Sequence, residues 1–183
     1  MLGADSVYVH PERGRLSLAI STVNDSLRSQ TIDVIIPQAK EAGIEIVARE
    51  DPEIFAGAEQ PTSLEAGGFD IALFASVGSP VRTTTASLYL SLEAQGGSQG
   101  QNYTQGGNPE VDALYEDFLS EPDPDASAEI GNEIDALLWE DLYTIPLYQR
   151  PTFLAYSSSL EGVDDNATEA GPLWNSEKWV RTV

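Results

Sequence analysis

The apolar positions of the first half of the chain alternate between strand and helix patterns. Residues 16–20 form a short apolar run that predicts a strand, and residues 27–42 repeat apolar side chains at helical spacing up to Gly43, which suits a left-handed C-terminal cap. Pro37 lies inside this helix and removes one hydrogen bond, so we expect a kink or two shorter helices. Residues 44–47 alternate and predict a second, parallel strand, which completes a β-α-β unit.

A longer apolar run follows a loop at residues 50–68. Residues 69–75 are almost continuously apolar, which is typical of a central strand covered on both faces. The next residues, from Ser76 to Thr85, are mostly small and hydroxylic. They follow the carboxyl end of the predicted strand, where ligands bind in open α/β sheets. A plain connection rich in serine and threonine is the other interpretation.

The second half of the chain predicts two helices after a glycine-rich loop at residues 93–107. Asn108 is a good N-cap, and Pro109 suits the first position of a helix because its missing amide hydrogen is not needed there. A second amphipathic helix begins at Asp125 or Ser127, after an acidic loop with two prolines. We expect both helices to pack on the sheet.

The last part of the chain contains two short apolar segments and a tryptophan-containing tail. Residues 144–148 and 152–156 predict strands, and their prolines place them at sheet edges or strand starts. Trp174 and Trp179 lie on a polar segment, and large aromatic side chains there call for a partner surface in another domain. Residues 1–15 have little periodicity and are interpreted as a leader.

Composition narrows the classes of function. Thirty acidic residues against nine basic ones give a net charge of -21, which repels phosphate backbones, so we expect no nucleic acid partner. The chain has no cysteine and a single histidine, His10. A typical zinc or copper site cannot be assembled from these residues, and we expect no metal and no cofactor. No apolar run is long enough to cross a bilayer.

The sequence contains no convincing catalytic motif. Residues 96–100 match the G-x-S-x-G pattern of hydrolases, but they lack the preceding strand and following helix that the pattern needs. His10 precedes this serine, whereas the chain order of that fold places histidine last. A carboxylate pair for glycoside hydrolysis stays possible, because such pairing is spatial. We expect the protein not to be an enzyme.

Several motifs occur together in a characteristic order: Ala42–Ile46, Gly68–Leu73, Asn102–Tyr103, Asn108–Leu114, Trp139–Asp141 and Ile145–Tyr148. This order resembles the carboxy-terminal lobe of the family 5 solute-binding proteins, the extracytoplasmic oligopeptide, dipeptide and nickel receptors of ABC importers. Residues 150–156 and 171–175 resemble an actinobacterial branch of that family. The resemblance extends from about Leu16 to Trp179.

The resemblance implies an α/β fold, namely a periplasmic-binding-protein-like lobe of type II, cluster C, with a mixed, mostly parallel sheet flanked by helices. We expect residues 1–15 to be a leader or linker, residues 16–160 the ligand-binding lobe, and residues 161–183 a return segment that packs on the missing amino-terminal lobe. A peptide or other small solute is enclosed between the lobes and delivered to ABC permease subunits. The full-length protein is expected to be extracytoplasmic and membrane-anchored, with its signal and lipobox outside this fragment.

The resemblance also points to ligand-facing residues. In oligopeptide-binding members, the loop after the Phe-Asp strand resembles a Trp-x-Ala-Asp-Tyr pattern whose aspartate holds the amino terminus of the peptide. Here Ser79 stands where that acid would be. We expect seven residues to line the cleft: Ser76, Val77, Gly78, Ser79, Arg82, Asn102 and Tyr103.

The nature of the solute stays open at this point. A peptide without the amine anchor, a modified peptide, a sugar or a glycolipid-like compound would each suit the serine-rich loop. The alternative to transport is an envelope lipoprotein that keeps the receptor fold but has a regulatory role through protein contacts. Such a protein would have its cleft filled by bulky side chains.

Overall fold

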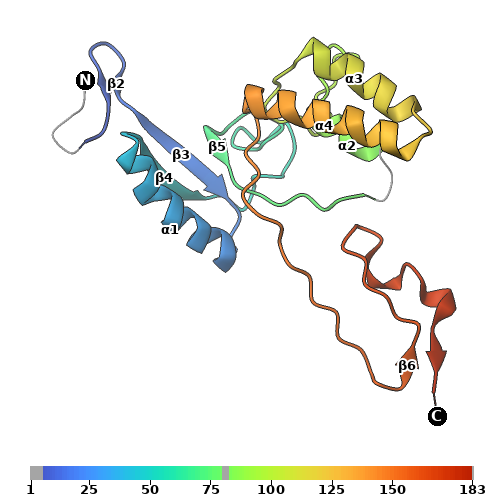
Figure 1. Ribbon diagram of the computed structural model, residues 1–183. Coiled ribbons are helices and arrows are strands. Elements are labelled where there is room, and N and C mark those ends of the chain that lie inside the picture. Colours follow the sequence, from blue (N-terminus) through green and yellow to red (C-terminus); the bar gives the residue numbers. More distant parts are fainter. Residues whose placement is uncertain (1–5, 80–82, 183) are drawn as a thin grey trace. The chain divides into compact units, whose positions relative to one another are not determined.

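The computed structural model describes residues 6–79 and 83–182, with side chains from Thr85 onward in the second range. The chain divides into two compact units, residues 1–75 and residues 76–183 (Figure 1). Each unit has its own hydrophobic core, and the two are described separately below.

The first unit is built on a three-stranded sheet whose order is β4-β3-β5. Strand β3 (Ser17–Thr22) pairs in parallel with β4 (Glu45–Glu50) along its whole length, and with β5 (Ile71–Ala72) over two residues. Helix α1 (Ser26–Glu41) connects β3 to β4. The predicted parallel β-α-β unit is therefore confirmed.

Helix α1 begins and ends through local signals in the sequence. The Asp25 carboxylate accepts a hydrogen bond of 3.0 Å from the main-chain nitrogen of Arg28, and Gly43 has a φ of 84°, which glycine adopts without strain. Pro37 lies inside an uninterrupted helix, which excludes two shorter helices, and the alternative of a kink at Pro37 stays a prediction. Ile32 joins Ile20 and Ile46 in the core between helix and sheet.

Strand β5 differs from the sequence prediction. The apolar run at residues 69–75 was predicted to be a central strand, but within the described residues only Ile71 and Ala72 pair, and they lie at the edge of the sheet beside β3. The Asp70 carboxylate accepts a 2.8 Å hydrogen bond from the main-chain nitrogen of Ala19. A side chain therefore replaces the main-chain partner that would have extended the ladder.

Residues before Arg15 contribute structure that their weak periodicity did not predict. Strands β1 (Val9–His10) and β2 (Gly14–Arg15) form an antiparallel hairpin, and Val7 is buried. The main-chain nitrogen of Tyr8 donates to the Gly43 carbonyl at 2.8 Å. The hairpin is thus attached to the end of α1, and the predicted domain boundaries stay a prediction.

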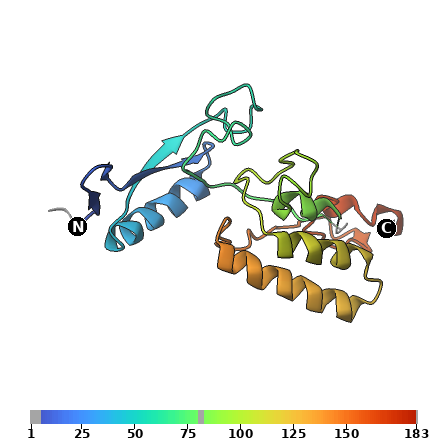
Figure 2. The same cartoon turned by 90° about the horizontal axis from the view of Figure 1, so that it is seen from above.

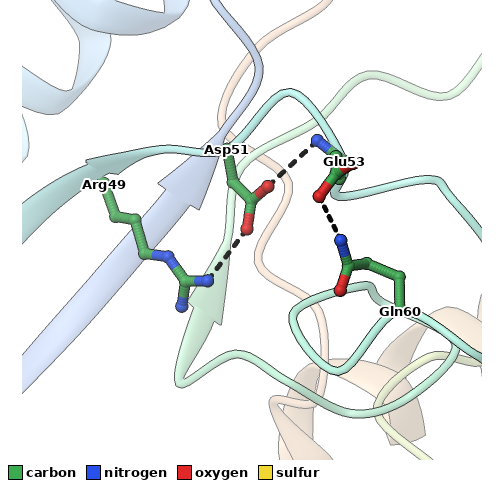
Figure 3. Close-up of polar contacts among 4 residues, drawn as sticks. All are labelled: Arg49, Asp51, Glu53 and Gln60. Carbon is green, nitrogen blue, oxygen red and sulfur yellow. Dashed lines mark hydrogen bonds and ion pairs between the residues drawn. The ribbon is translucent and has the colours of Figure 1, made fainter.

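The loop after β4 is folded around the carboxylate of Asp51 (Figure 3). This carboxylate accepts hydrogen bonds of 2.9 Å from Nη2 of Arg49 and from the main-chain nitrogen of Glu53. The Gln60 amide donates to the Glu53 carboxylate. Hydrogen bonds to its charged form, from the Thr62 side chain first, hold the pKa of Asp51 below its ordinary value.

The second unit contains three helices that pack on one another: α2 (Thr83–Tyr89), α3 (Pro109–Ser120) and α4 (Pro124–Asp141). Helices α3 and α4 lie side by side (Figure 2). Their shared core contains Ala86, Val111, Tyr115 and Ile134. Within this unit, the apolar stripes of α3 and α4 thus pack on each other and on α2. The expected packing of both helices on the sheet stays a prediction.

Helices α3 and α4 begin in the same way, with a polar cap residue followed by proline. Asn108 caps α3 and Pro109 is its first residue, as predicted. Helix α4 uses the same pair of residue types, with Asp123 as cap and Pro124 in the first turn. The predicted start at Asp125 or Ser127 is therefore slightly late. Helix α2 was not predicted, because its threonines are poor helix formers and its stability comes from packing.

The chain after α4 has less regular structure than the sequence predicted. Residues 144–148 and 152–156 form no strand, and Phe153 is 99% exposed. Further on, β6 (Leu160–Glu161) pairs in antiparallel with β7 (Val180–Arg181), and two short 3-10 helices, Gly171–Leu173 and Ser176–Lys178, lie between them. The predicted strands lack a ladder partner among the described residues.

Candidate ligand-binding site

The predicted ligand-facing stretch 76–79 is an extended segment at the start of the second unit. Ser76, Val77 and Gly78 are exposed, and Ser79 is half-buried. The Gly78 carbonyl accepts a 2.9 Å hydrogen bond from the main-chain nitrogen of Glu169, which ties the stretch to the C-terminal segment. Most of this short stretch is therefore accessible to a ligand.

Asn102 has a different environment from the rest of the predicted site. Asn102 is only 5% exposed. The amide nitrogen donates to the carbonyls of Leu90 at 3.0 Å and Gly106 at 2.7 Å, and the amide oxygen accepts from the Thr104 hydroxyl at 2.8 Å. Both amide hydrogens are therefore used to hold the loop together.

Tyr103 follows directly on this fixed residue and is half-buried. Its main-chain nitrogen donates to the Gln101 carbonyl at 3.0 Å, so the loop is tightly turned at this point. Asn102 thereby determines where Tyr103 lies. Arg82, the remaining predicted site residue, lies outside the described residues.

A pocket of about 50 Å³ lies beside the Asn102 loop, inside the second unit. Its walls come from the end of α2, the loop, the second half of α4 and the chain that leaves α4. The lining residues are Leu88, Tyr89, Asn102, Thr104, Asp135, Leu138, Trp139, Tyr143, Thr144 and Pro146. Among these residues, only Asn102 was predicted from the sequence to be a site residue. Asp135 and Trp139 lie one turn apart on α4, and this pair of a carboxylate and an aromatic ring on one helix face is the sequence signal that could have indicated the pocket.

Two tyrosines in this region carry shifted pKa values. Burial, and to a lesser degree the Asp135 carboxylate, raise the pKa of Tyr89. Burial also raises the pKa of Tyr115 to about 12, with a smaller contribution from Tyr89. The two rings stack with centroids 6.4 Å apart. Both phenols are therefore kept neutral, and the Tyr89 ring is fixed in position.

The part of the chain that the structure describes contains neither a candidate metal site nor a candidate membrane-spanning helix. It contains no group of three or more histidine, cysteine, aspartate or glutamate side chains placed to hold a metal ion. None of its helices has the length and apolar character needed to span a bilayer.

No protein-family profile matches this sequence. The chain is 24% identical over 150 residues to an uncharacterized lipoprotein of Mycobacterium tuberculosis, a match that covers 82% of the chain and 26% of that relative. It is 31% identical over 94 residues to the oligopeptide-binding protein OppA of the same species, covering 51% of the chain and 15% of the relative. The chain thus spans about a quarter or less of these relatives.

A solved structure matches almost the whole chain. The oligopeptide-binding protein of Thermus thermophilus, complexed with a pentapeptide, superposes with a TM-score of 0.74 at 20% identity. The match covers 98% of the chain and 33% of that protein. The fold class predicted from the sequence is therefore confirmed.

Proposed function

We propose, from the similarity of this chain to part of solved and curated oligopeptide-binding proteins, that it is one lobe, the carboxy-terminal one, of the substrate-binding component of an ABC importer. It captures a peptide or peptide-like solute in a cleft between two lobes and presents it to membrane permeases. The observation that carries the proposal is the match of 98% of the chain to one third of an oligopeptide-binding protein. The sequence identity to OppA supports the same class of solute.

The proposed ligand surface combines the stretch 76–79 and Arg82 with the loop that carries Asn102 and Tyr103. An extended, exposed main chain can pair with an extended peptide through hydrogen bonds that do not depend on the side chains of that peptide. Ser79 provides no negative charge for the amino terminus of a peptide. Affinity then comes mainly from the main chain and from the Tyr103 ring, while Asn102 keeps that ring in place.

The proposed receptor is extracytoplasmic and anchored to the membrane in its full-length form. The support is the relative named a lipoprotein, because a covalently attached lipid chain anchors a protein to a membrane. Its work requires no chemistry on the solute, because ligand binding shifts the population toward a closed form. The protein is accordingly proposed to be non-enzymatic.

A regulatory lipoprotein with the same fold is the second candidate. The relative that matches 82% of the chain, against 51% for OppA, is an uncharacterized lipoprotein whose name gives no solute. In that case the main function would be a protein contact, and the cleft would hold no solute.

Native mass spectrometry of the full-length protein that contains this chain, mixed with a peptide and metabolite library, separates the two candidates. Binding of peptides supports the receptor, and a protein that binds nothing in the library contradicts it. The full-length protein is needed, because one lobe supplies only part of the contacts and binds too weakly.

A matched pair of variants locates the binding surface. A Cβ at Gly78 would meet no atom within 4 Å, so Gly78→Trp is tolerated by the fold while it obstructs a ligand at the 76–79 stretch. Glu116→Trp adds the same ring to an exposed position of α3. We expect only Gly78→Trp to reduce peptide affinity, by about tenfold or more. Equal affinities would place the ligand elsewhere.

A further inference from the structure

The pocket beside the Asn102 loop combines aromatic rings with one carboxylate. Tyr89, Trp139 and Tyr143 contribute the rings, and Asp135 contributes the acid. None of the described residues that line the pocket is basic. Aromatic faces and a carboxylate both attract cations, and the overall charge of -21 adds to the attraction.

Two of the three rings, those of Tyr89 and Tyr143, are packed against other parts of the unit. Tyr89 stacks on Tyr115, which is buried in the helical core. Tyr143 rests on Gly106, since a Cβ at that glycine would lie 2.7 Å from three carbons of the ring. A site whose walls are already ordered loses little conformational entropy when it binds a ligand.

The turn that ends α4 brings Tyr143 to the pocket. Leu142 caps this helix in the left-handed conformation with a φ of 54°, and its main-chain nitrogen donates to the Leu138 carbonyl. The chain therefore reverses direction immediately after the turn that carries Leu138 and Trp139. Tyr143, Thr144 and Pro146, which follow this cap, line the pocket together with Asp135, Leu138 and Trp139 of the helix.

The carboxylate belongs to the same small volume as the rings. Asp135 is exposed, so it lies at the rim rather than in the core. Its charge reaches the Tyr89 phenol strongly enough to raise the pKa of that group. A cation seated among the rings would thus interact with a negative charge as well as with ring faces.

We propose that this pocket is a binding site for a small alkylammonium group, seated between the rings of Trp139 and Tyr143 with Asp135 as its counter-ion. A volume of about 50 Å³ admits one such group and excludes a peptide backbone. The ammonium comes either from a free amine or from the end of a lysine side chain. The pocket shares Asn102 with the solute surface proposed above, but its rings and its carboxylate are not part of that surface.

The side-chain N–H signals of tryptophan in a two-dimensional NMR spectrum of the 183-residue chain test this site. Methylammonium chloride, with sodium chloride at equal ionic strength as reference, is the probe for a free amine. An acetylated and amidated Ala-Lys-Ala peptide is the probe for a lysine side chain. We expect a saturable shift of the Trp139 signal, with a dissociation constant in roughly the millimolar range for so small a ligand.

Two charge-matched variants on one helix provide the control. Asp135→Asn removes the counter-ion and should weaken binding about fivefold to tenfold. Glu133→Gln removes the same charge from an exposed α4 residue that does not line the pocket, and should change affinity less than about twofold. Tyr143→Leu removes a ring face and should weaken binding without removing charge.

The NMR titrations and the variants can support or overturn the alkylammonium site. Saturable binding of either probe that depends on Asp135 supports the site, and the probe that binds more tightly identifies the source of the ammonium. A Trp139 shift that sodium chloride reproduces would overturn the proposal. So would equal weakening by Asp135→Asn and Glu133→Gln, because it would mean that only the general charge of the helix matters.

Discussion

Replacement of Asn102 by alanine separates a structural role from a ligand-binding role for this residue. The side chain donates both amide hydrogens to main-chain carbonyls, those of Leu90 and Gly106, at 3.0 and 2.7 Å. It also accepts a hydrogen bond from the Thr104 hydroxyl at 2.8 Å. Asn102→Ala removes all three bonds at a residue that is only 5% exposed. The Gly106 carbonyl then loses its amide donor, whereas the Leu90 carbonyl keeps the Gln95 side-chain amide as a donor at 2.7 Å.

The size of the effect follows from these contacts. A hydrogen bond contributes about 1 kcal/mol net, and a buried polar group left without a partner costs about 1–3 kcal/mol. Partial access of water to the loop offsets some of that cost. We therefore expect the free energy of unfolding to fall by about 3 kcal/mol. With an m-value of about 2 kcal/mol/M in urea, the midpoint falls by about 1.5 M.

Urea unfolding followed by tryptophan fluorescence measures this loss where it arises. All three tryptophans, Trp139, Trp174 and Trp179, lie in residues 76–183, the unit that contains the loop. Asn132→Ala is the control, because Asn132 is an exposed residue of α4 and its replacement should change stability by less than about 0.5 kcal/mol.

The same pair of variants shows how the reasoning could fail. If Asn102→Ala is as stable as Asn132→Ala but binds peptide more weakly, Asn102 contacts the ligand directly and the loop does not depend on it. Asn102→Asp is a stricter test, since a carboxylate would place an oxygen against the carbonyls that now receive amide hydrogens. It should be at least as destabilising as Asn102→Ala.

Three further predictions concern separate parts of the molecule. Tyr115, whose pKa is raised to about 12, should ionise last among the tyrosines in an alkaline absorbance titration, and this late phase should be missing in Tyr115→Phe. The stability that the neutral Tyr115 side chain contributes is complete below pH 10.0 and is lost as the pH rises through 12. Gly68→Ala would place a Cβ 2.0 Å from the Pro61 carbonyl oxygen, so thermal unfolding should show a loss of about 2 kcal/mol or more, and an unchanged melting temperature would contradict the close contact. Asp51→Asn should be less stable than the wild type above pH 3.8. The difference between their urea midpoints should shrink as the pH falls through the lowered pKa of Asp51. A difference that does not depend on pH would mean that the hydrogen bonds to Asp51, from the Thr62 side chain first, do not favour the ionised carboxylate.

Helix boundaries were predictable because their determinants are local. Asn108 and Pro109 mark the start of α3 in the sequence, and the structure confirms both the cap and its hydrogen bond to the main-chain nitrogen of Glu110. Asp123 and Pro124 carry the same information for α4. In each case the residues that decide the boundary are within three positions of it.

Strands were predicted less well, because a ladder requires a partner that is distant in sequence. The predicted strands at residues 16–20 and 44–47 are connected by α1 and do pair with each other, as β3 and β4, over six residues of each strand. Residues 69–75 have the same apolar character but pair over only two residues. Residues 144–148 and 152–156 have no ladder partner among the described residues, so apolar pattern alone did not make them strands.

The ligand-facing surface and the pocket differ in how far the sequence could indicate them. The stretch 76–79 follows a strand of a parallel sheet, which is a general location for ligands. The pocket is assembled from α2, a loop, α4 and the chain after it, and its side chains come from positions as far apart as Leu88 and Pro146. Only the packing of the helices brings them together, so no local pattern could have identified the set.

Three polar side chains of this chain hold its loops together through hydrogen bonds. Asn102 holds the loop before α3, Asp51 holds the loop after β4, and Asn175 donates to the Gly162 carbonyl at 2.9 Å and accepts from the Trp179 indole at 2.9 Å. Groups used in this way cannot also bind a solute without weakening the fold. In the receptor that we propose, recognition would then depend on exposed main chain and on aromatic rings. Both interact with ligands of varied side chains, which is what a receptor for peptides of different sequence requires.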